Sequence, residues 1–296
     1  NFLISQIDIF FRLFRLIRKE KISVVDAWTP LYPGLFAWAL SRLCGIPFVI
    51  RVVQNNDKIY EVTGRQSERR LWFTRKIEKI IERFVLKRAS LVAAVNQDNL
   101  DFALANGAVP EKSTLFRYGN MIDKRHFSKP LERPDGSILL REIGVEPYRF
   151  LLYIGRFEII KHPDDVLRVF AKVRSFGHDV KLLMVGDGSL REKLSEQARE
   201  LGVENDTIFC GNKDQAWLIS IIPLAAVVLS PHTGRALLEV AMAETPIVAY
   251  DVDWQSELIE TGVTGELVPH KAWKEMADGA NRFLTNPEYA RAMGKS

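Results

Sequence analysis

The sequence predicts an α/β protein with two doubly wound, parallel-sheet domains that face a cleft. Short apolar segments rich in β-branched residues alternate with helical segments along the chain. The strand segments are hydrophobic almost without interruption, which is typical of parallel strands covered by helices on both faces. An irregular, proline-containing stretch over 118–147 divides them into two sets. We therefore expect an N-terminal domain over 1–130, a linker over 131–147 and a C-terminal domain over 148–296.

Each predicted strand is a short run dominated by apolar residues, followed by a segment with helical periodicity. The strand segments of the first domain are 22–27, 48–53, 91–95 and 113–116. Those of the second domain are 149–154, 181–185, 207–209, 226–229, 247–250 and 266–268. Each helix should return the chain to the same edge of its sheet. In this architecture, ligands bind outside the carboxyl ends of the strands.

Composition indicates the compartment and argues against a membrane span. The chain has 296 residues, of which 47% are hydrophobic, and a net charge of +4. Cys44 and Cys210 lie in separate halves, which favours reduced thiols and a cytoplasmic location. The longest apolar run, 218–229, contains a serine and a proline and is too short to cross a bilayer. Charged residues recur through 1–19, which indicates an amphipathic helix rather than a signal peptide.

Basic residues concentrate over 65–88, where Trp72 and Phe73 lie among lysines and arginines. A helix of this composition suits the anionic inner face of a membrane, so peripheral membrane contact is one interpretation. The other is a solvated helix face, because glutamates stand three or four residues from lysines, as in ordinary helix ion pairs. No nucleic-acid-binding motif follows, and we expect no nucleic-acid partner.

The segment 230–246 predicts an anion-binding site where a strand runs into a helix. Gly234 would let the backbone approach a ligand, and the first helical turn presents N–H groups and the positive end of the helix dipole. Glu239 in the second turn suits the hydroxyls of a ribose. The residues of the predicted cradle are Gly234, Arg235, Ala236 and Leu237. The alternative is an amphipathic helix with an N-terminal glycine and a solvated glutamate.

Five segments of the second half form an ordered set of motifs. They are Tyr153–Lys161 (YIGRFEIIK), Val185–Leu190 (VGDGSL), Phe209–Gly211 (FCG), Leu237–Ala243 (LLEVAMA) and Thr264–Pro269 (TGELVP). Through them the chain resembles the family-4 retaining glycosyltransferases, from Ile22 to Gly294. The resemblance implies the GT-B fold, with a Rossmann-like acceptor-side domain followed by a Rossmann-like domain that binds a nucleotide sugar. It also implies a fragment that lacks an N-terminal strand-helix block and a C-terminal crossover helix.

The resemblance assigns roles to residues that follow the first strand of the second domain. Arg156 and Lys161 would be catalytic, because they would hold the diphosphate leaving group and neutralise the charge that grows on it. Gly155 and Gly188 would line the donor site, and Glu239 would bind the nucleotide ribose. The weaker candidates on the acceptor side are Asp26, Trp28, Asn55 and Asp57.

Two positions depart from the family pattern. The first glutamate of the family's E-x7-E motif is Pro231 here, which leaves recognition of the donor sugar to other residues. His232 or Thr233 could substitute for it. In the first domain, Trp28 occupies a place where many relatives carry a histidine. The sequence alone names no catalytic base.

The resemblance therefore implies metal-independent, retaining transfer of a hexose from a UDP- or GDP-sugar to a glycan or lipid-linked acceptor, as in polysaccharide biosynthesis. We expect no metal or other cofactor, because the five histidines lack ligand spacing. One alternative is a degenerate relative that binds a nucleotide or glycan without catalysis, and another is a sugar-nucleotide epimerase. The motif at 186–191 has an arginine at the last glycine position, which argues against a nicotinamide dehydrogenase.

Overall fold

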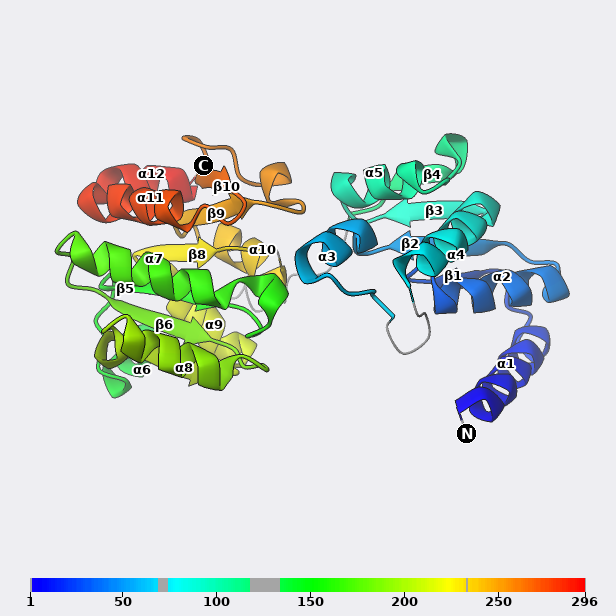
Figure 1. The fold of residues 1–296 in the computed structure, drawn as a ribbon, viewed down its shortest axis with the longest axis horizontal. Coiled ribbons are helices and arrows are strands. Elements are labelled where there is room, and N and C mark those ends of the chain that lie inside the picture. The colour runs from blue at the N-terminus through cyan, green and yellow to red at the C-terminus, as the bar shows by residue number, and fades with distance from the viewer. Residues whose placement is uncertain (1, 69–73, 118–133, 233, 296) are drawn as a thin grey trace. The chain divides into compact units, whose positions relative to one another are not determined.

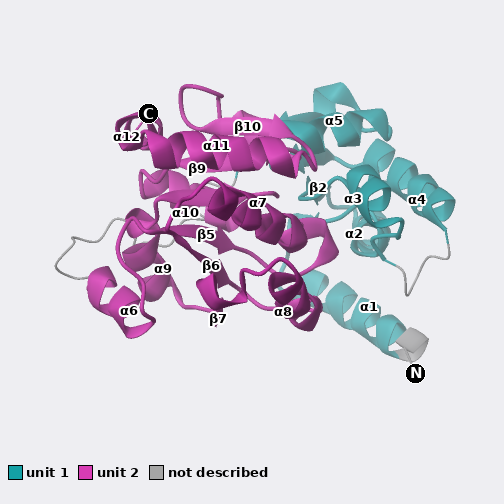
Figure 2. Cartoon of the chain, turned by 60° about the vertical axis from the view of Figure 1, so that its left-hand side comes forward, with its two compact units in different colours: residues 1–118 teal, residues 119–296 magenta. Residues whose placement is uncertain are grey.

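The computed structural model describes residues 2–68, 74–117, 134–232 and 234–295. The chain forms two compact units, Asn1–Tyr118 and Gly119–Ser296 (Figure 2). Each unit is built around its own parallel sheet (Figure 1). The strands lie at the positions that the sequence predicts, with ends shifted by a few residues. The predicted fold class, two parallel-sheet α/β domains, is confirmed.

The first unit has a four-stranded parallel sheet in the order β1-β2-β3-β4. Its strands are β1 (Val25–Ala27), β2 (Phe48–Val52), β3 (Leu91–Ala94) and β4 (Ser113–Leu115). Its helices are α1 (Phe2–Lys19), α2 (Tyr32–Cys44), α3 (Asn56–Thr63), α4 (Arg75–Arg88) and α5 (Gln97–Ala105). Apolar side chains of β1, β2 and β3 and of α2, α4 and α5 form one core, in which Ile50, Val52 and Val85 are fully buried.

The second unit has a six-stranded parallel sheet in the order β10-β9-β8-β5-β6-β7. Its strands are β5 (Phe150–Ile154), β6 (Lys181–Val185), β7 (Thr207–Gly211), β8 (Val227–Ser230), β9 (Ile247–Asp251) and β10 (Glu266–Pro269). Its helices are α6 (Gly136–Glu142), α7 (Pro163–Ser175), α8 (Arg191–Glu200), α9 (Gln215–Ile221), α10 (Arg235–Met242), α11 (Trp273–Thr285) and α12 (Pro287–Lys295).

Both faces of this second sheet are covered, as continuous hydrophobicity of the strands predicts. Successive side chains of a strand point to opposite faces, so Leu151 and Tyr153 enter one core and Phe150 and Leu152 the other. Helices α7, α8, α11 and α12 pack in the first core, and α6, α9 and α10 in the second. The strand order reverses beside β5, with β6 on one side and β8 on the other. Such a switch point is where doubly wound sheets bind ligands.

The structure differs from the sequence expectation over 131–147. Residues 136–142 form α6, and Asp135 caps this helix by accepting a hydrogen bond from the Ser137 N–H. Leu140 of α6 is fully buried in the core of the second unit. Burial of this apolar side chain makes the segment from residue 134 part of that unit rather than a linker. Residues 131–133 lie outside the described residues.

Candidate functional site

The loops that follow β5 and β6 form one platform at the carboxyl edge of the second sheet. The Phe157 N–H donates to the Asp187 carbonyl at 2.9 Å, which ties the first loop to the second. The N–H and hydroxyl of Ser189 donate to the Glu158 carboxylate at 3.1 and 2.9 Å. These bonds lower the pKa of Glu158, because they stabilise its charged form. The platform is therefore fixed by side chains as well as by backbone.

Glycines make the close approach of these two loops sterically feasible. A Cβ on Gly188 would lie 2.6 Å from the carbonyl oxygen of Phe157. A Cβ on Gly186 would lie 1.9 Å from the carbonyl oxygen of Gly155, and its φ of +133° also favours glycine. Packing alone thus explains why residue 188 is a glycine. The contacts of Gly155 and Gly188 with the donor stay predictions.

Lys161 lies beside two of the residues that the sequence assigns to the donor, His232 and Gly234. Its Nζ is 3.2 Å from Nδ1 of His232. The same Nζ is 3.9 Å from the position a Cβ would take on Gly234, directly before α10. Burial, together with the charge of Arg156, lowers the pKa of Lys161 to about 8, while Asp253 opposes this shift. The loops after β5 and β8 therefore bring a lysine, an imidazole and a helix N-terminus together.

The start of α10 forms part of the predicted cradle. Gly234 precedes the helix, and Arg235 and Ala236 are its first residues. The Leu237 N–H instead donates to the Gly234 carbonyl at 3.1 Å, and the Leu237 side chain is buried in the core. Its amide is therefore engaged within the first helical turn, and the place of Leu237 in the cradle stays a prediction. Thr233 lies outside the described residues.

Arg235 and Glu239 form an ion pair one helical turn apart. Arg235 Nε donates to Glu239 Oε1 at 2.9 Å, and the exposed fractions of the two side chains are 48% and 2%. The alternative of a solvated glutamate is therefore wrong. Arg235 shields the carboxylate from solvent, so a ribose bound to Glu239 would share that carboxylate with the guanidinium. The role of Glu239 in ribose binding stays a prediction.

We expect Glu239→Gln to weaken binding of UDP or GDP about tenfold, because an amide offers one acceptor oxygen where a carboxylate offers two. The unfolding free energy should fall by only about 1 kcal/mol, since the amide oxygen can still accept from Arg235. Titration calorimetry and thermal unfolding measure the two effects. Arg235→Gln is the matched control, because it leaves Glu239 buried without its cation and should cost more stability. Equal affinity of the unchanged protein for UDP and 2′-deoxy-UDP would contradict the ribose contact.

Gln255 was missed by the sequence analysis and fixes the loop after β8. Its side chain is fully buried. Its amide nitrogen donates to the carbonyls of Ser230 and Tyr250 at 3.0 and 2.8 Å, and its oxygen accepts from the Ser230 hydroxyl at 2.9 Å. Gln255 thus joins the carboxyl ends of β8 and β9. Nothing in the sequence distinguishes it from a surface glutamine.

His162, which is buried and follows Lys161 in the chain, forms a pair with His270, which is half-buried, although the sequence shows them as scattered. Their Nε2 atoms are 3.0 Å apart, so one imidazole donates and the other accepts. Burial, and then the neighbouring His270, lowers the pKa of His162 to about 4. His126 lies outside the described residues. Within the part of the chain that the structure describes, no three His, Cys, Asp or Glu side chains are grouped to hold a metal ion.

The acceptor-side candidates of the first unit are mostly engaged within that unit. Arg51 donates to the Asp26 carboxylate. Asn55 caps α3, where its side-chain oxygen accepts from the N–H groups of Asp57 and Lys58 at 3.1 and 3.2 Å. Trp28 follows β1 with 69% of its surface exposed. Asp26 and Asn55 therefore have local structural partners, and Trp28 remains available to a ligand.

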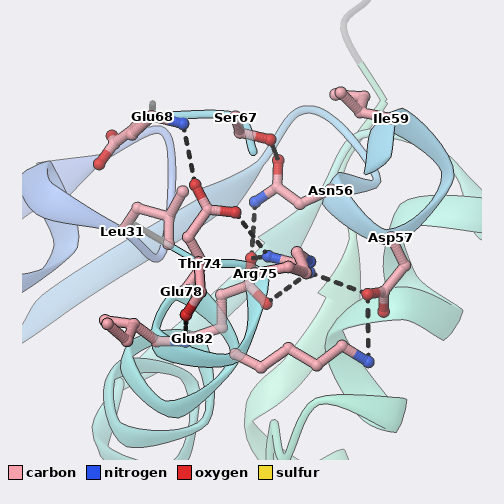
Figure 3. Close-up of polar contacts among 12 residues, drawn as sticks. Leu31, Asn56, Asp57, Ile59, Ser67, Glu68, Thr74, Arg75, Glu78 and Glu82 are labelled. Carbon is pink, nitrogen blue, oxygen red and sulfur yellow. Dashed lines mark hydrogen bonds and ion pairs between the residues drawn. The ribbon is translucent and has the colours of Figure 1, made fainter. Parts of the chain in front are cut away.

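Asp57 belongs to a buried ionic cluster around Arg75 (Figure 3). The Arg75 guanidinium donates to Asp57 at 2.9 Å, to Glu78 at 3.0 Å and to both oxygens of Glu82 at 2.7 and 2.8 Å. Asn56 also donates to Glu82, at 2.8 Å. Glu78 and Glu82 are completely buried. Interpretation of these α4 glutamates as solvated surface pairs is therefore wrong.

Membrane contact through 65–88 remains a prediction. Trp72 and Phe73, the aromatic residues on which it depends, lie outside the described residues. Arg75 faces the buried cluster rather than solvent. None of the helices in the described ranges combines the length and hydrophobicity that a bilayer crossing needs.

Known proteins resemble this chain in sequence and in fold. It is 24% identical to alpha-D-kanosaminyltransferase of Streptomyces kanamyceticus, over 89% of this chain and 68% of that protein. It is 29% identical to N-acetyl-alpha-D-glucosaminyl L-malate synthase of Bacillus anthracis, over 72% of this chain and 55% of that protein. The chain thus spans about half to two thirds of these relatives. HepE of Anabaena, solved in complex with UDP and glucose, superimposes with a TM-score of 0.80 at 18% identity, over 97% of this chain and 74% of HepE.

The structural likeness shows the GT-B fold that the sequence predicts. The family assignment comes from the second unit, which contains the five motifs. A sequence model of the family described as "Glycosyl transferases group 1" matches residues 141–296. This match covers more than half of the 296 residues. The chain therefore belongs to the glycosyl transferases group 1 family.

Proposed function

We propose that this chain catalyses retaining transfer of a hexose from a UDP- or GDP-sugar to a glycan or lipid-linked acceptor. The observation that carries the proposal is the position of Lys161 beside His232 and Gly234 at the start of α10. A diphosphate placed there would meet the ammonium, helical N–H groups and the positive end of the helix dipole. The complexes of HepE with UDP and with UDP-glucose support the choice of ligand.

In this proposal the charge that develops on the leaving diphosphate is stabilised by protein cations. Lys161 lies at the helix N-terminus, and Arg156 lies on the same loop, close enough to lower the pKa of Lys161. Both charges are in place before the sugar–phosphate bond breaks, so they favour the transition state without reorganisation. The reaction would need no metal and no other cofactor. The base that accepts the proton of the attacking hydroxyl is not assigned.

A degenerate protein that binds the nucleotide without turnover is the second candidate. Two observations favour it. Pro231 offers no side-chain acceptor to a donor hydroxyl where the family motif has a glutamate. In the first unit, Asp26 and Asp57 are engaged by Arg51 and Arg75. Both candidates use the same donor site, so only turnover separates them.

A panel of UDP- and GDP-sugars, incubated with glycan and lipid-linked acceptors and with EDTA, tests the proposal. We expect release of nucleoside diphosphate and an α-linked product from an α-linked donor, with no loss of activity in EDTA. Nucleotide binding without release would support the degenerate protein. A product that is still a nucleotide sugar would indicate an epimerase. Absence of both binding and release with every donor would contradict a nucleotide-sugar site.

A further inference from the structure

The side chains of Lys161 and His232 restrict each other's protonation. A lysine ammonium has three N–H donors and no acceptor. At 3.2 Å from Lys161 Nζ, His232 Nδ1 must therefore accept when the lysine is charged, which leaves the imidazole proton on Nε2. If both groups were protonated, two positive charges would face each other at hydrogen-bond distance. The geometry thus favours one positive charge on the pair.

The surroundings of the pair supply charges of both signs. On the loop after β5, Arg156 repels the Lys161 ammonium, and the neighbouring His162 is kept neutral by burial. Asp253, beyond β9, attracts the ammonium. On α10, the positive charge of Arg235 is paired with the negative carboxylate of Glu239. The pair therefore lies in a partly buried site with an excess of cations. An added anion would offset this excess of positive charge.

We propose that His232 is a positioning residue for the donor diphosphate: its imidazole holds the Lys161 ammonium at the start of α10 and shares one positive charge with it, so that diphosphate binding takes up a proton from solvent. This inference rests on the proposed function. It assigns His232 a role that does not require contact with the donor sugar. The contact joins a side chain after β8 to one after β5, so no single sequence motif contains both residues.

The sign of the pH dependence follows from Lys161. Its pKa of about 8 in the free protein should rise when a diphosphate binds, because the anion stabilises the ammonium. Below pH 8 the lysine is charged in both states, so this group gives no pH dependence. Above pH 8 the free protein loses the proton and the complex keeps it. Affinity for UDP should therefore fall about tenfold between pH 7 and pH 9.

Titration calorimetry of the whole chain with UDP, in two buffers of different ionisation enthalpy, tests the proposal. At pH 8 the unchanged protein should take up about half a proton per UDP. His232→Ala should bind about fivefold more weakly at pH 7, because Lys161 loses the acceptor that holds it. It should also lose part of the pH dependence, since water entering the space relieves the burial that lowers the pKa of the lysine, while Arg156 still opposes its charge. His232→Asn should restore the affinity at pH 7, because its side-chain oxygen can accept near the position of Nδ1.

His178→Ala is the matched control. His178 lies beyond the opposite end of α7, where its Nε2 is 2.6 Å from Asn281 Oδ1, and its replacement should change neither affinity nor proton uptake. Tight UDP binding without proton uptake, or an unchanged profile in His232→Ala, would overturn this inference and leave the proposed function intact. Absence of UDP and GDP binding in the unchanged protein at pH 7 would overturn both.

Discussion

Replacing Arg75 with methionine should lower the unfolding free energy of the first unit by about 3–5 kcal/mol. Among the described residues, the Arg75 guanidinium is the cation that pairs with Glu78 and Glu82, whose side chains are both completely buried. Methionine has a similar length and no charge, so it removes the positive charge of Arg75 from two carboxylates that are buried away from water. The cost is that of uncompensated buried charge rather than of lost packing.

Hydrogen exchange of the α4 peptides, 75–88, measures this effect within the first unit. The matched control is Lys76→Met, the next residue of the helix, which is exposed. A surface substitution of this kind should change the free energy by no more than about 0.5 kcal/mol. Equal protection in Arg75→Met and Lys76→Met would mean that the buried cluster does not contribute to the unfolding free energy of the first unit.

Replacing Arg156 or Lys161 with alanine should weaken binding of UDP or GDP by about 1.5–3 kcal/mol, or roughly tenfold to a hundredfold. In the proposed site, each change would remove one charge-assisted contact to the diphosphate. Thermal stability should change little for Arg156, because its side chain is exposed at the strand edge. Turnover should fall further than affinity, since the charges act most strongly on the leaving group.

Lys172→Ala is the control for this pair. Lys172 is an exposed lysine at the far end of α7, so its removal changes the net charge equally without touching the site. Titration calorimetry with UDP measures the affinities. Unchanged affinity in both Arg156→Ala and Lys161→Ala would mean that the phosphates bind elsewhere.

The sequence predicts the fold well because strands buried on both faces leave a continuous apolar signal. Leu182 to Val185 and Val227 to Leu229 are examples, and both segments form strands of the second sheet. Segment 131–147 was misinterpreted because its prolines suggested an irregular chain. The apolar run from Ile138 to Leu140 after Asp135 could have identified a short capped helix there.

The candidate site was predictable where neighbours in sequence are neighbours in space. Arg235 and Glu239 are four residues apart, and their ion pair could have been inferred from helical spacing. The contact of Lys161 with His232 could not, because 71 residues separate them and only the sheet order brings their loops together. The contact of Gln255 with Ser230 could not be predicted for the same reason. The cluster around Arg75 was hidden because burial of α4 depends on the sheet that it covers.

Amide hydrogen exchange with and without saturating UDP or GDP tests the central claim most directly, because it locates the bound nucleotide without assuming turnover. The account predicts slower exchange in peptides that cover Gly155–Lys161 and Gly234–Glu239, with no change in α11, which packs in the core of the same unit. Protection confined to other segments of the second unit, with these two peptides unchanged, would contradict a diphosphate site at the start of α10.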